Sequence, residues 1–259
     1  MDEIISSLTN AKVKYVGRLQ TDRRFREQEH HFVVEGSRWL AELIAHDVTP
    51  HTLFCTAAWA GVAENGRLLS QITVSPLLVA DPVMRRMSDT QTPPGVLAVV
   101  PLPALPWPPQ PEMLLILDQV GNPGNLGTML RTAAAAGVNG VLLAPGCVDA
   151  FNPKAVRGGM GAHLRLPIRA AGWPEIKTVC AELAVWTAAA DGQIGYTDVN
   201  WRQPSALIIG SEASGPSPEA NELSQRRTYI PMSAATESLN AAVAAAVILF
   251  EAARQRATG

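Results

Sequence analysis

The sequence has few cysteines and no long apolar run, and each shortage excludes a class of protein. Its 259 residues include 3 cysteines. Because Cys55, Cys147 and Cys180 lie far apart, they form neither a disulfide framework nor a CxxC metal or redox motif, and we expect small buried thiols. The longest apolar run, residues 241–250, is well short of the roughly 20 residues that cross a bilayer.

Charged residues are also sparse. They make up 17% of the chain, whereas an average domain has about 25%. Together with a hydrophobic content of 47%, this composition excludes disordered and fibrous chains. The first residues, MDEIISSLTN, carry acids where a secretory signal carries positive charge. We therefore expect a folded cytoplasmic protein that does not span a membrane.

A proline-rich stretch divides the sequence into two parts. Residues 101–111 contain six prolines, which forbid a helix and a central strand, so we place a linker there. Before the linker, short apolar and β-branched runs alternate with helical segments and predict a small α/β domain over residues 1–104. The strands expected in it are residues 31–36, 52–57, 71–75 and 95–100.

The part after the linker, residues 105–259, alternates strands and helices more strongly. Its strands are apolar throughout, which is typical of a parallel sheet covered by helices on both faces. The ligand site of such a sheet lies at the carboxyl ends of its strands. The expected strands are residues 113–120, 140–146, 185–191 and 205–212. The expected helices are residues 126–137, 174–183 and 238–256.

Positive charge is concentrated near the amino terminus. Residues 12–26 contain six basic side chains and one acid, although the whole chain has a formal net charge of −2. Such a stretch fits a contact with phosphates. The more frequent case is a solvated helix face, here partly neutralised by Glu27 and Glu29, so charge alone leaves nucleic-acid binding open.

The first candidate functional segment of the second part is residues 117–137. It runs from a strand through a glycine-rich turn into a helix, a junction at which backbone N–H groups approach a ligand. The GxxGxxG spacing of its glycines matches neither the dinucleotide fingerprint nor the phosphate-binding P-loop. Its polar residues are Asn122, Asn125 and Arg131. An arginine forks onto phosphates and carboxylates, although a lone one is more often a surface ion-pair residue.

Two further segments follow. In residues 206–219, Glu212 lies between glycines after a strand, where a carboxylate is well placed for a hydrogen-bonded site, although an ordinary helix-capping loop has the same composition. In residues 229–256, Ser238 and Asn240 lie at the mouth of the last helix. Ser238 fits a helix cap, and without a His/Asp relay it does not indicate a hydrolase triad.

Together the three segments resemble the SpoU (TrmH) family of RNA ribose 2′-O-methyltransferases, within the SPOUT superfamily. The family's motifs occur in order as NPGNLGTMLRTA, GSEASG and IPMSAATESLN. The front of the chain, with KVKYVGRL, FVVEGSRWLAE and SDTQTPPGVLAVV, resembles the family's ribosomal-protein-like substrate-binding domain. Ala234 replaces a common glycine and Gly159 a frequent serine, which bears on the cofactor loop and on helix packing.

The resemblance implies a fold, a cofactor and a set of site residues. The fold is an RNA-binding α/β domain over residues 1–104 and a SPOUT α/β domain over residues 105–259 with a carboxyl-terminal trefoil knot. The methyl donor is S-adenosylmethionine, no metal is implied, and a homodimer forms through the SPOUT domain and lends residues across its interface. The catalytic residues implied are Arg131, Asn122, Glu212, Ser238 and Asn240. The cofactor-binding residues implied are Gly210, Ile230, Met232 and Leu239. In the RNA-binding domain, the candidate phosphate contacts are four residues of the basic stretch, Lys14, Arg18, Arg23 and Arg24.

A role for Arg131 as the base that takes the ribose proton conflicts with the chemistry of arginine. A ribose hydroxyl is a poor nucleophile until its proton leaves, yet a guanidinium keeps its own proton at neutral pH. We therefore interpret Arg131 as the group that grips the adjoining RNA phosphate and stabilises the developing oxyanion, and we leave the base open. The dedicated front domain favours ribosomal RNA over transfer RNA as the substrate.

Other functions fit parts of the sequence. A transfer-RNA 2′-O-methyltransferase is the alternative within the family. An RNA-binding ribosome-assembly protein without catalysis has the same fold, but it has no need of the five catalytic residues. A nicotinamide-dependent oxidoreductase requires GxGxxG spacing and an acid about twenty residues further on, where this chain has Asn139 and Gly140.

Overall fold

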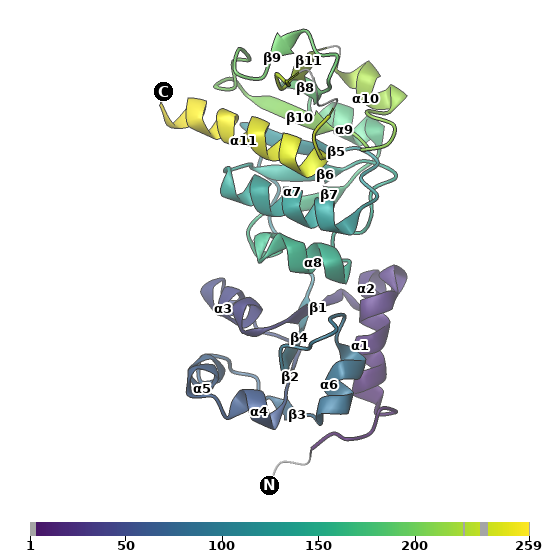
Figure 1. The fold of residues 1–259 in the computed structure, drawn as a ribbon, viewed down its shortest axis with the longest axis vertical. Coiled ribbons are helices and arrows are strands. Elements are labelled where there is room, and N and C mark those ends of the chain that lie inside the picture. The colour runs from purple at the N-terminus through teal and green to yellow at the C-terminus, as the bar shows by residue number, and fades with distance from the viewer. Residues whose placement is uncertain (1–3, 225, 234–237, 259) are drawn as a thin grey trace. The chain divides into compact units, whose positions relative to one another are not determined.

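The chain folds into two compact units (Figure 1). The structure is a computed structural model, and it describes residues 4–224, 226–233 and 238–258. The first unit comprises Met1–Ala104 together with Phe151–Leu164, and the second comprises Leu105–Ala150 together with Arg165–Gly259. Both units combine helices with a β-sheet.

The first unit is built on a sheet whose four described strands run in the order β1–β4–β2–β3. β4 (Val96–Pro101) lies between β1 (His31–Glu35) and β2 (Thr52–Cys55) and is antiparallel to both. β3 (Leu77–Leu78) extends the sheet parallel to β2. Because β1 and β2 both run antiparallel to β4, they begin at the same end of the sheet.

Helices cover both faces of this sheet because its residues alternate between two apolar clusters. Along β4, Ala98 belongs to one cluster, whereas Leu97 and Val99 belong to the other. The Leu97 face is covered by α1 (Ala11–Thr21), α2 (Arg23–Glu29) and α6 (Asp81–Met87). The Ala98 face is covered by α3 (Ser37–Ala45), α4 (Ala57–Ala60) and α5 (Ala63–Leu69).

The segment Phe151–Leu164 completes the core of the first unit. It contains α8 (Pro153–Gly159) and the 3-10 helix η1 (Ala162–Leu164). The Phe151 ring centroid lies 5.1 Å from that of Phe32, and residues of α8 and η1 are buried in the same cluster. The predicted division at residues 104 and 105 omits this excursion, because a single boundary cannot show a chain that returns to an earlier unit.

His163 explains the glycine at position 159. The His163 side chain is buried in this cluster, and its ring centroid lies 5.4 Å from that of Phe151. A Cβ atom at position 159 would lie 2.6 Å from Cε1 of His163, so a serine fits there only if the ring shifts. This departure from the family pattern therefore concerns packing in the first unit. The other departure, Ala234, lies outside the described residues.

The sheet of the second unit is parallel throughout its described strands, as the apolar strands predict. The strand order is β7–β6–β5–β10–β8–β11–β9. The central strands are β5 (Met113–Leu117), β6 (Gly140–Leu143), β8 (Ala184–Ala188) and β10 (Ser205–Ile209). The sequence did not predict the three outer ones, β7 (Ile168–Ala170), β9 (Ile194–Gly195) and β11 (Arg227–Tyr229), which are short.

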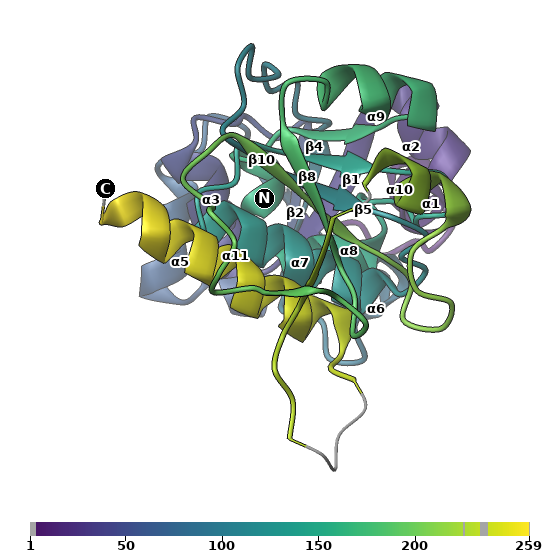
Figure 2. The same ribbon diagram turned by 90° about the horizontal axis from the view of Figure 1, so that it is seen from above.

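Helices cover both faces of the parallel sheet, which confirms the predicted arrangement. α7 (Pro123–Ala135) and α11 (Ala241–Ala257) pack against each other on one face (Figure 2). α9 (Trp173–Val179) and α10 (Pro218–Leu223) pack on the opposite face, over a cluster that includes Ile116 of β5. β5, β6 and β10 are buried on both faces, so apart from Ser205 at the start of β10 their residues are apolar without alternation.

Capping side chains fix where the two long helices begin. Asn122 accepts a hydrogen bond from the backbone N–H of Gly124 at 2.8 Å, so α7 begins at Pro123 and not at residue 126 as predicted. Asn240 accepts from the backbone N–H of Ala242 at 3.0 Å, so α11 begins three residues later than predicted. Asn240, and not Ser238, is the cap of α11.

The strand predicted at residues 71–75 is wrong. The structure describes these residues and shows no strand there. Ile72 and Val74 are partly buried and pack on the core of the first unit. The alternation of apolar and polar residues here therefore reflects side chains that pack on the core, although the backbone of this segment does not pair as a strand.

Burial was predicted for all three thiols, and two of them are buried. Cys55 and Cys180 are buried, whereas Cys147 is half-buried and its Sγ donates to the Leu117 carbonyl at 3.1 Å. Burial raises the pKa of Cys147 to about 11 and that of Cys180 to about 12. Both groups stay protonated at neutral pH and are poor nucleophiles.

Candidate active site

The register of the parallel sheet brings the first two motifs together. β5 and β10 are paired so that Leu117 lies opposite Ile209. The sheet continues to β6 beyond β5 and to β8 beyond β10, so the loops that leave these two strands diverge at a switch point. Asn125 lies in the first turn of α7, after β5, and Glu212 lies three residues after the end of β10.

A hydrogen-bond network joins Glu212 to two asparagines from different motifs. Oε1 of Glu212 accepts a hydrogen bond from Nδ2 of Asn125 and another, at 2.8 Å, from Nδ2 of Asn240. Nδ2 of Asn240 also lies 3.4 Å from Oδ1 of Asn125. Since Oδ1 of Asn240 caps α11, its amide is held with Nδ2 toward the carboxylate. The network thus joins the three motifs through one residue of each.

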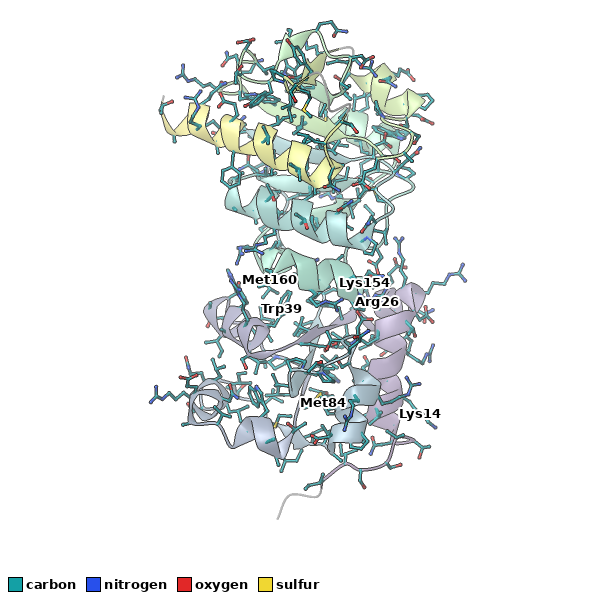
Figure 3. All side chains as sticks on the ribbon, in the orientation of Figure 1. Lys14, Arg26, Trp39, Met84, Lys154 and Met160 are labelled. Atoms are coloured by element: carbon teal, nitrogen blue, oxygen red, sulfur yellow. The ribbon has the colours of Figure 1, made fainter. Side chains whose placement is uncertain are left out.

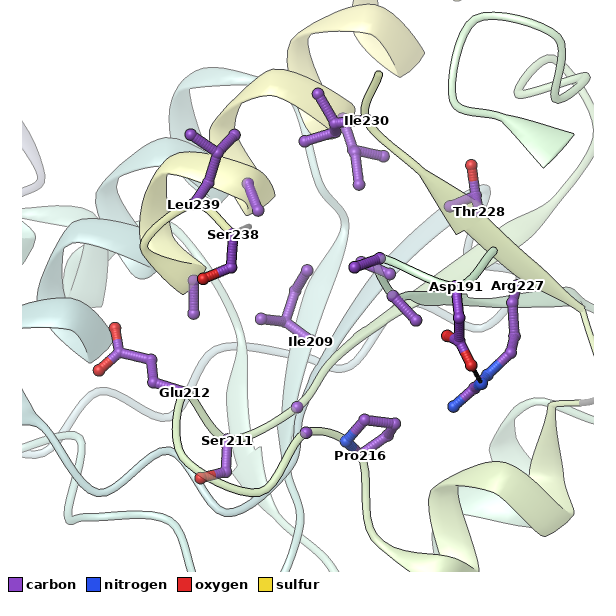
Figure 4. Close-up of a pocket in the computed structure, with 18 of the residues that line it drawn as sticks. Asp191, Ile209, Ser211, Glu212, Pro216, Arg227, Thr228, Ile230, Ser238 and Leu239 are labelled. Atoms are coloured by element: carbon purple, nitrogen blue, oxygen red, sulfur yellow. Dashed lines mark hydrogen bonds and ion pairs between the residues drawn. The ribbon is translucent and has the colours of Figure 1, made fainter. Parts of the chain in front are cut away.

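A pocket of about 390 Å³ adjoins this network (Figure 4). It lies at the carboxyl ends of β8, β10 and β11, where a parallel sheet is expected to bind its ligand. Its walls are largely apolar, with Ile209, Ile230 and Ile248 among them. Polar side chains lie at two places in the lining (Figure 4): Ser211, Glu212 and Ser238 on one side, and Asp191, Arg227 and Thr228 on the other.

The Asp191 side is held by an ion pair. Nη1 of Arg227 contacts the carboxylate of Asp191, and Nη2 of Arg227 donates to Asn221 at 3.2 Å. The Arg227 side chain is 24% exposed and that of Asp191 is 70% exposed. Arg227 is therefore the fixed member of the pair, and the carboxylate is the group that a ligand can reach.

Gly210 lets the backbone of the loop after β10 fold back close to the end of that strand. A Cβ atom at this position would lie 2.5 Å from the backbone nitrogen of Pro216 and 2.6 Å from the carbonyl carbon of Gly215. The loop is held in turn by Asp118, whose Oδ2 accepts from the backbone N–H of Ser217 at 2.6 Å. Any side chain at position 210 would have to displace the backbone of a restrained loop.

The structure brings most of the predicted site residues to this pocket. Those that line it are Gly210, Glu212, Ile230, Met232, Ser238 and Leu239. Asn240 adjoins the pocket through its bond to Glu212. Within the described part of the chain, neither Asn122 nor Arg131 belongs to the lining. The roles implied for all of these residues stay predictions.

Arg131 and Asn122 occupy different surroundings from the other predicted residues. Asn122 caps α7. Arg131 lies on the exposed side of α7, in line with Gly124 and Thr128, and it has no hydrogen bond or ion pair with any residue that the structure describes. Its guanidinium is thus available to a group outside this chain's own pocket.

Three residues of the site were not predicted. Asn125 belongs to the polar set of the first segment, but of the two asparagines in this set the resemblance places only Asn122 in the site. Asn125 lies in the first turn of α7, and its side chain faces the loop that follows β10. That position is the signal from which its place in the site could have been predicted. Asp191 is the last residue of a predicted strand, and Arg227 lies in a strand that the sequence does not reveal.

The predicted RNA-binding residues lie on α1 and α2 of the first unit. All four are exposed, and Lys14 extends outward from α1 (Figure 3). The guanidinium of Arg18 lies 3.7 Å from the ring centroid of Phe25, and Arg23 forms a 2.8 Å ion pair with Glu27. The role of the four residues in RNA binding stays a prediction.

The basic stretch is less uniform than its sequence. Arg26 belongs to it but is 4% exposed, and it donates to the Leu19 carbonyl. Arg26 therefore stabilises the junction of α1 and α2 and does not add to the positive surface.

Two further findings concern the described residues. No helix among them is both long enough and apolar enough to cross a membrane. Nor do they contain a cluster of three or more His, Cys, Asp or Glu side chains that could hold a metal ion.

The fold and the pocket define a two-unit α/β protein with a ligand-binding pocket at the carboxyl ends of a parallel sheet. Residues 112–250 match the SpoU rRNA Methylase family, and residues 10–98 match the MRM3-like substrate binding domain. The chain belongs to the SpoU rRNA methylase family. This confirms the family that the three motifs predict, and with it the enzyme class, an S-adenosylmethionine-dependent RNA methyltransferase.

Relatives of known name match almost the whole chain. The 23S rRNA (guanosine(2553)-2′-O)-methyltransferase RlmP of Bacillus subtilis is 30% identical over 95% of this chain and 97% of its own length. The 23S rRNA (uridine(2479)-2′-O)-methyltransferase of Streptomyces viridochromogenes is 31% identical over 96% of this chain and 92% of its own. The solved structure of the SpoU methyltransferase AviRb from the same organism, in complex with AdoMet, has a TM-score of 0.84 at 29% identity and covers 96% of this chain and 99% of its own.

Proposed function

We propose that this chain transfers a methyl group from S-adenosylmethionine to a ribose 2′-hydroxyl of ribosomal RNA. The observation that carries the proposal is the network of Glu212 with Asn125 and Asn240 at the edge of the pocket. Relatives named as 23S rRNA 2′-O-methyltransferases support ribosomal RNA as the substrate.

The residues of the pocket fit S-adenosylmethionine. The apolar walls with Ile209 and Ile230 suit an adenine ring, and the Asp191 carboxylate suits the hydroxyl and ammonium donors of the molecule. The cradle at Gly210 leaves room for a close backbone approach. When bound, the cofactor supplies an electrophilic methyl carbon on its sulfonium.

The polar side chains at the Glu212 side position the acceptor. Two amide donors hold the Glu212 carboxylate in one orientation. The second oxygen of the carboxylate is therefore already oriented, so binding of the acceptor costs little further side-chain entropy. Ser238 adds a hydroxyl on the same side of the pocket (Figure 4). The 2′-hydroxyl is oriented by these groups, and Arg131 stabilises the negative charge that develops on its oxygen.

We infer that Arg131 acts from the partner subunit of a homodimer. Val243 and Phe250 of α11 are 47% and 51% exposed, which is high for large apolar side chains. α11 packs against α7, whose exposed side carries Arg131. A homodimer that buries this surface carries Arg131 into the interface, from which the guanidinium reaches the partner subunit's pocket.

Replacing Phe250 by aspartate is expected to dissociate the dimer. A buried charge at the centre of an apolar interface costs at least about 2 kcal/mol, or roughly a 30-fold rise in the dimer dissociation constant. Light scattering after gel filtration measures the mass. Ile194→Asp is the matched control, because Ile194 is also an exposed apolar residue, at 39%, but lies in β9. If the Phe250→Asp protein stays dimeric, the exposed surface of α11 is not the dimer interface.

We also infer the trefoil knot of the family for the second unit. A close backbone approach between segments far apart in the sequence supports it. At Gly192, a Cβ atom would lie 2.7 Å from the carbonyl carbon of Thr228. The ribosomal substrate keeps the cytoplasm as the predicted location.

The decisive experiment is methyl transfer to RNA from cells that lack the gene. The protein is incubated with radiolabelled S-adenosylmethionine and with ribosomal or transfer RNA from these cells, and 2′-O-methylation is mapped by resistance to alkaline hydrolysis. The proposal expects one ribosomal nucleotide to become labelled, and no label in RNA from wild-type cells. Label in transfer RNA selects that alternative. Calorimetric binding of the donor without any transfer would support the inactive RNA-binding alternative.

A further inference from the structure

A second cavity, in the first unit, is lined by a cluster of ring side chains. It has a volume of about 340 Å³ and lies between α1 and the end of the sheet at which β1 and β2 begin. Tyr15, His31 and His51 supply the rings, and Lys12 and Glu29 supply the charged groups. None of the three ring residues belongs to a family motif that the site of the second unit uses.

The sheet register brings the two histidines together. His31 lies opposite Pro101 of β4, and the backbone N–H of His51 donates to the Val99 carbonyl at 2.8 Å. Their ring centroids are 4.6 Å apart at an interplanar angle of 44°. The rings are thus held by the backbone of β1 and by the backbone just before β2, on either side of β4, which makes the cluster a fixed platform.

Tyr15 ties the platform to α1. Its hydroxyl lies 3.2 Å from Nδ1 of His31 and donates to Oε2 of Glu29 at 3.2 Å. Burial and this hydrogen bond raise the pKa of Tyr15 to about 12, so the phenol stays protonated. Burial, followed by the charge of His51, lowers the pKa of His31, which keeps that ring neutral at pH 7. Tyr15 and His31 therefore present uncharged rings at neutral pH.

The charged groups of the cavity complement a nucleotide. Lys12 is exposed one turn before Tyr15 on α1, on the helix that carries the basic residues Lys14 and Arg18. An ammonium group beside a ring platform suits the phosphate of a nucleotide whose base stacks on the rings. The second oxygen of Glu29 can accept from an N–H group on the edge of the base.

We propose that this cavity binds an unstacked base of single-stranded RNA, stacked on His51 and His31 with Lys12 at the phosphate. The proposal rests on the proposed function, because it takes the first unit as the RNA-binding part of an RNA methyltransferase. Bases within a duplex are covered by their neighbours, so a platform of this kind selects loops, bulges and ends. The cavity would then contribute to the choice of the methylated site.

The test compares His51→Ala with His51→Phe. His51 is exposed, so neither variant removes a core side chain. Stacking of one base contributes about 1–3 kcal/mol. His51→Ala is therefore expected to weaken binding of a fluorescein-labelled single-stranded 12-mer RNA of mixed sequence by about fivefold or more, measured by anisotropy. His51→Phe keeps a ring and is expected to bind within about twofold of the wild type.

Two controls separate stacking from general charge attraction. A blunt RNA duplex of the same composition is expected to bind both variants as it binds the wild type. Lys12→Ala is expected to reduce the salt dependence of single-strand binding by about one unit of slope, whereas Lys177→Ala, an exposed lysine of the second unit, leaves it unchanged.

The outcomes distinguish this cavity from the proposed function. Equal single-strand affinities for His51→Ala and the wild type, with methyl transfer to ribosomal RNA intact, overturn the cavity and leave the enzyme's activity standing. Equal losses for alanine and phenylalanine would mean that His51 acts by hydrogen bonding and not by stacking, which also overturns the proposal. Absence of both RNA binding and methyl transfer in the wild type would overturn the two together.

Discussion

Arg131→Ala is expected to lower the rate of methyl transfer at least 100-fold while leaving donor binding unchanged. Loss of a fixed cation at a developing oxyanion costs about 3 kcal/mol of transition-state stabilisation. The donor pocket is lined by other residues, so its affinity does not depend on this guanidinium. Single-turnover rates on ribosomal RNA and calorimetry with S-adenosylmethionine measure the two quantities. A rate within about tenfold of the wild type, or ~1.4 kcal/mol, would contradict the role.

Arg131→Lys is the matched variant, because it keeps the charge and loses the fork. A point charge replaces a bidentate donor, so an intermediate rate is expected if phosphate grip and charge both matter. The alanine and lysine variants together separate the loss of charge from the loss of geometry.

Mixed dimers test whether Arg131 works across the subunit interface. A dimer with Arg131→Ala in one subunit and Glu212→Ala in the other has one pocket with an intact Glu212 and, from the partner, an intact Arg131. Subunit exchange between the two inactive homodimers is then expected to restore about a quarter of wild-type activity, since half of the dimers are mixed and each has one working site. If Arg131 serves its own pocket, every site in the mixture lacks one group and no activity returns.

The sequence predicts the parallel sheet and most of its pocket, because buried strands and sequence motifs can both be recognised from consecutive residues. The strands around Leu117 and Ile209 are apolar on both faces, which fixes their class without knowledge of their partners. Glu212 lies three residues after the end of one of these strands, so its place at a carboxyl end could be predicted. Its partner Asn125 could not, because the contact depends on the pairing of β5 with β10, and residues 118–204 separate these strands along the chain.

Contacts between distant segments account for the parts that the sequence does not reveal. Arg227 lies in a strand of three residues with polar neighbours, which is formed by pairing with β8 and β9 and not by its own pattern. Likewise, residues 151–164 carry no compositional mark of the unit to which they belong. Their place follows from rings such as Phe151, which complete a cluster built by β1 and α3.

The loop beyond β10 is restrained on both sides, which makes Gly210 the position where a single methyl group has the largest expected effect on donor binding. Asp118 holds the loop at Ser217, and Ser211 and Gly215 exchange backbone hydrogen bonds at 3.0 and 2.9 Å. A Cβ atom at position 210 meets backbone atoms of Gly215 and Pro216, which cannot rotate away as a side chain can.

Gly210→Ala is therefore expected to weaken donor binding at least 30-fold, or by about 2 kcal/mol, and to lower the free energy of unfolding by about 1–3 kcal/mol. Calorimetry with S-adenosylhomocysteine and thermal unfolding measure these effects. Gly121→Ala is the matched control, because a Cβ atom there would have no described heavy atom within 4 Å beyond residue 121 and its two chain neighbours. This variant should bind the donor within about twofold of the wild type. If Gly210→Ala binds as tightly as Gly121→Ala, the loop yields to a methyl group, and the close approach of backbone at this position is not what shapes the donor pocket.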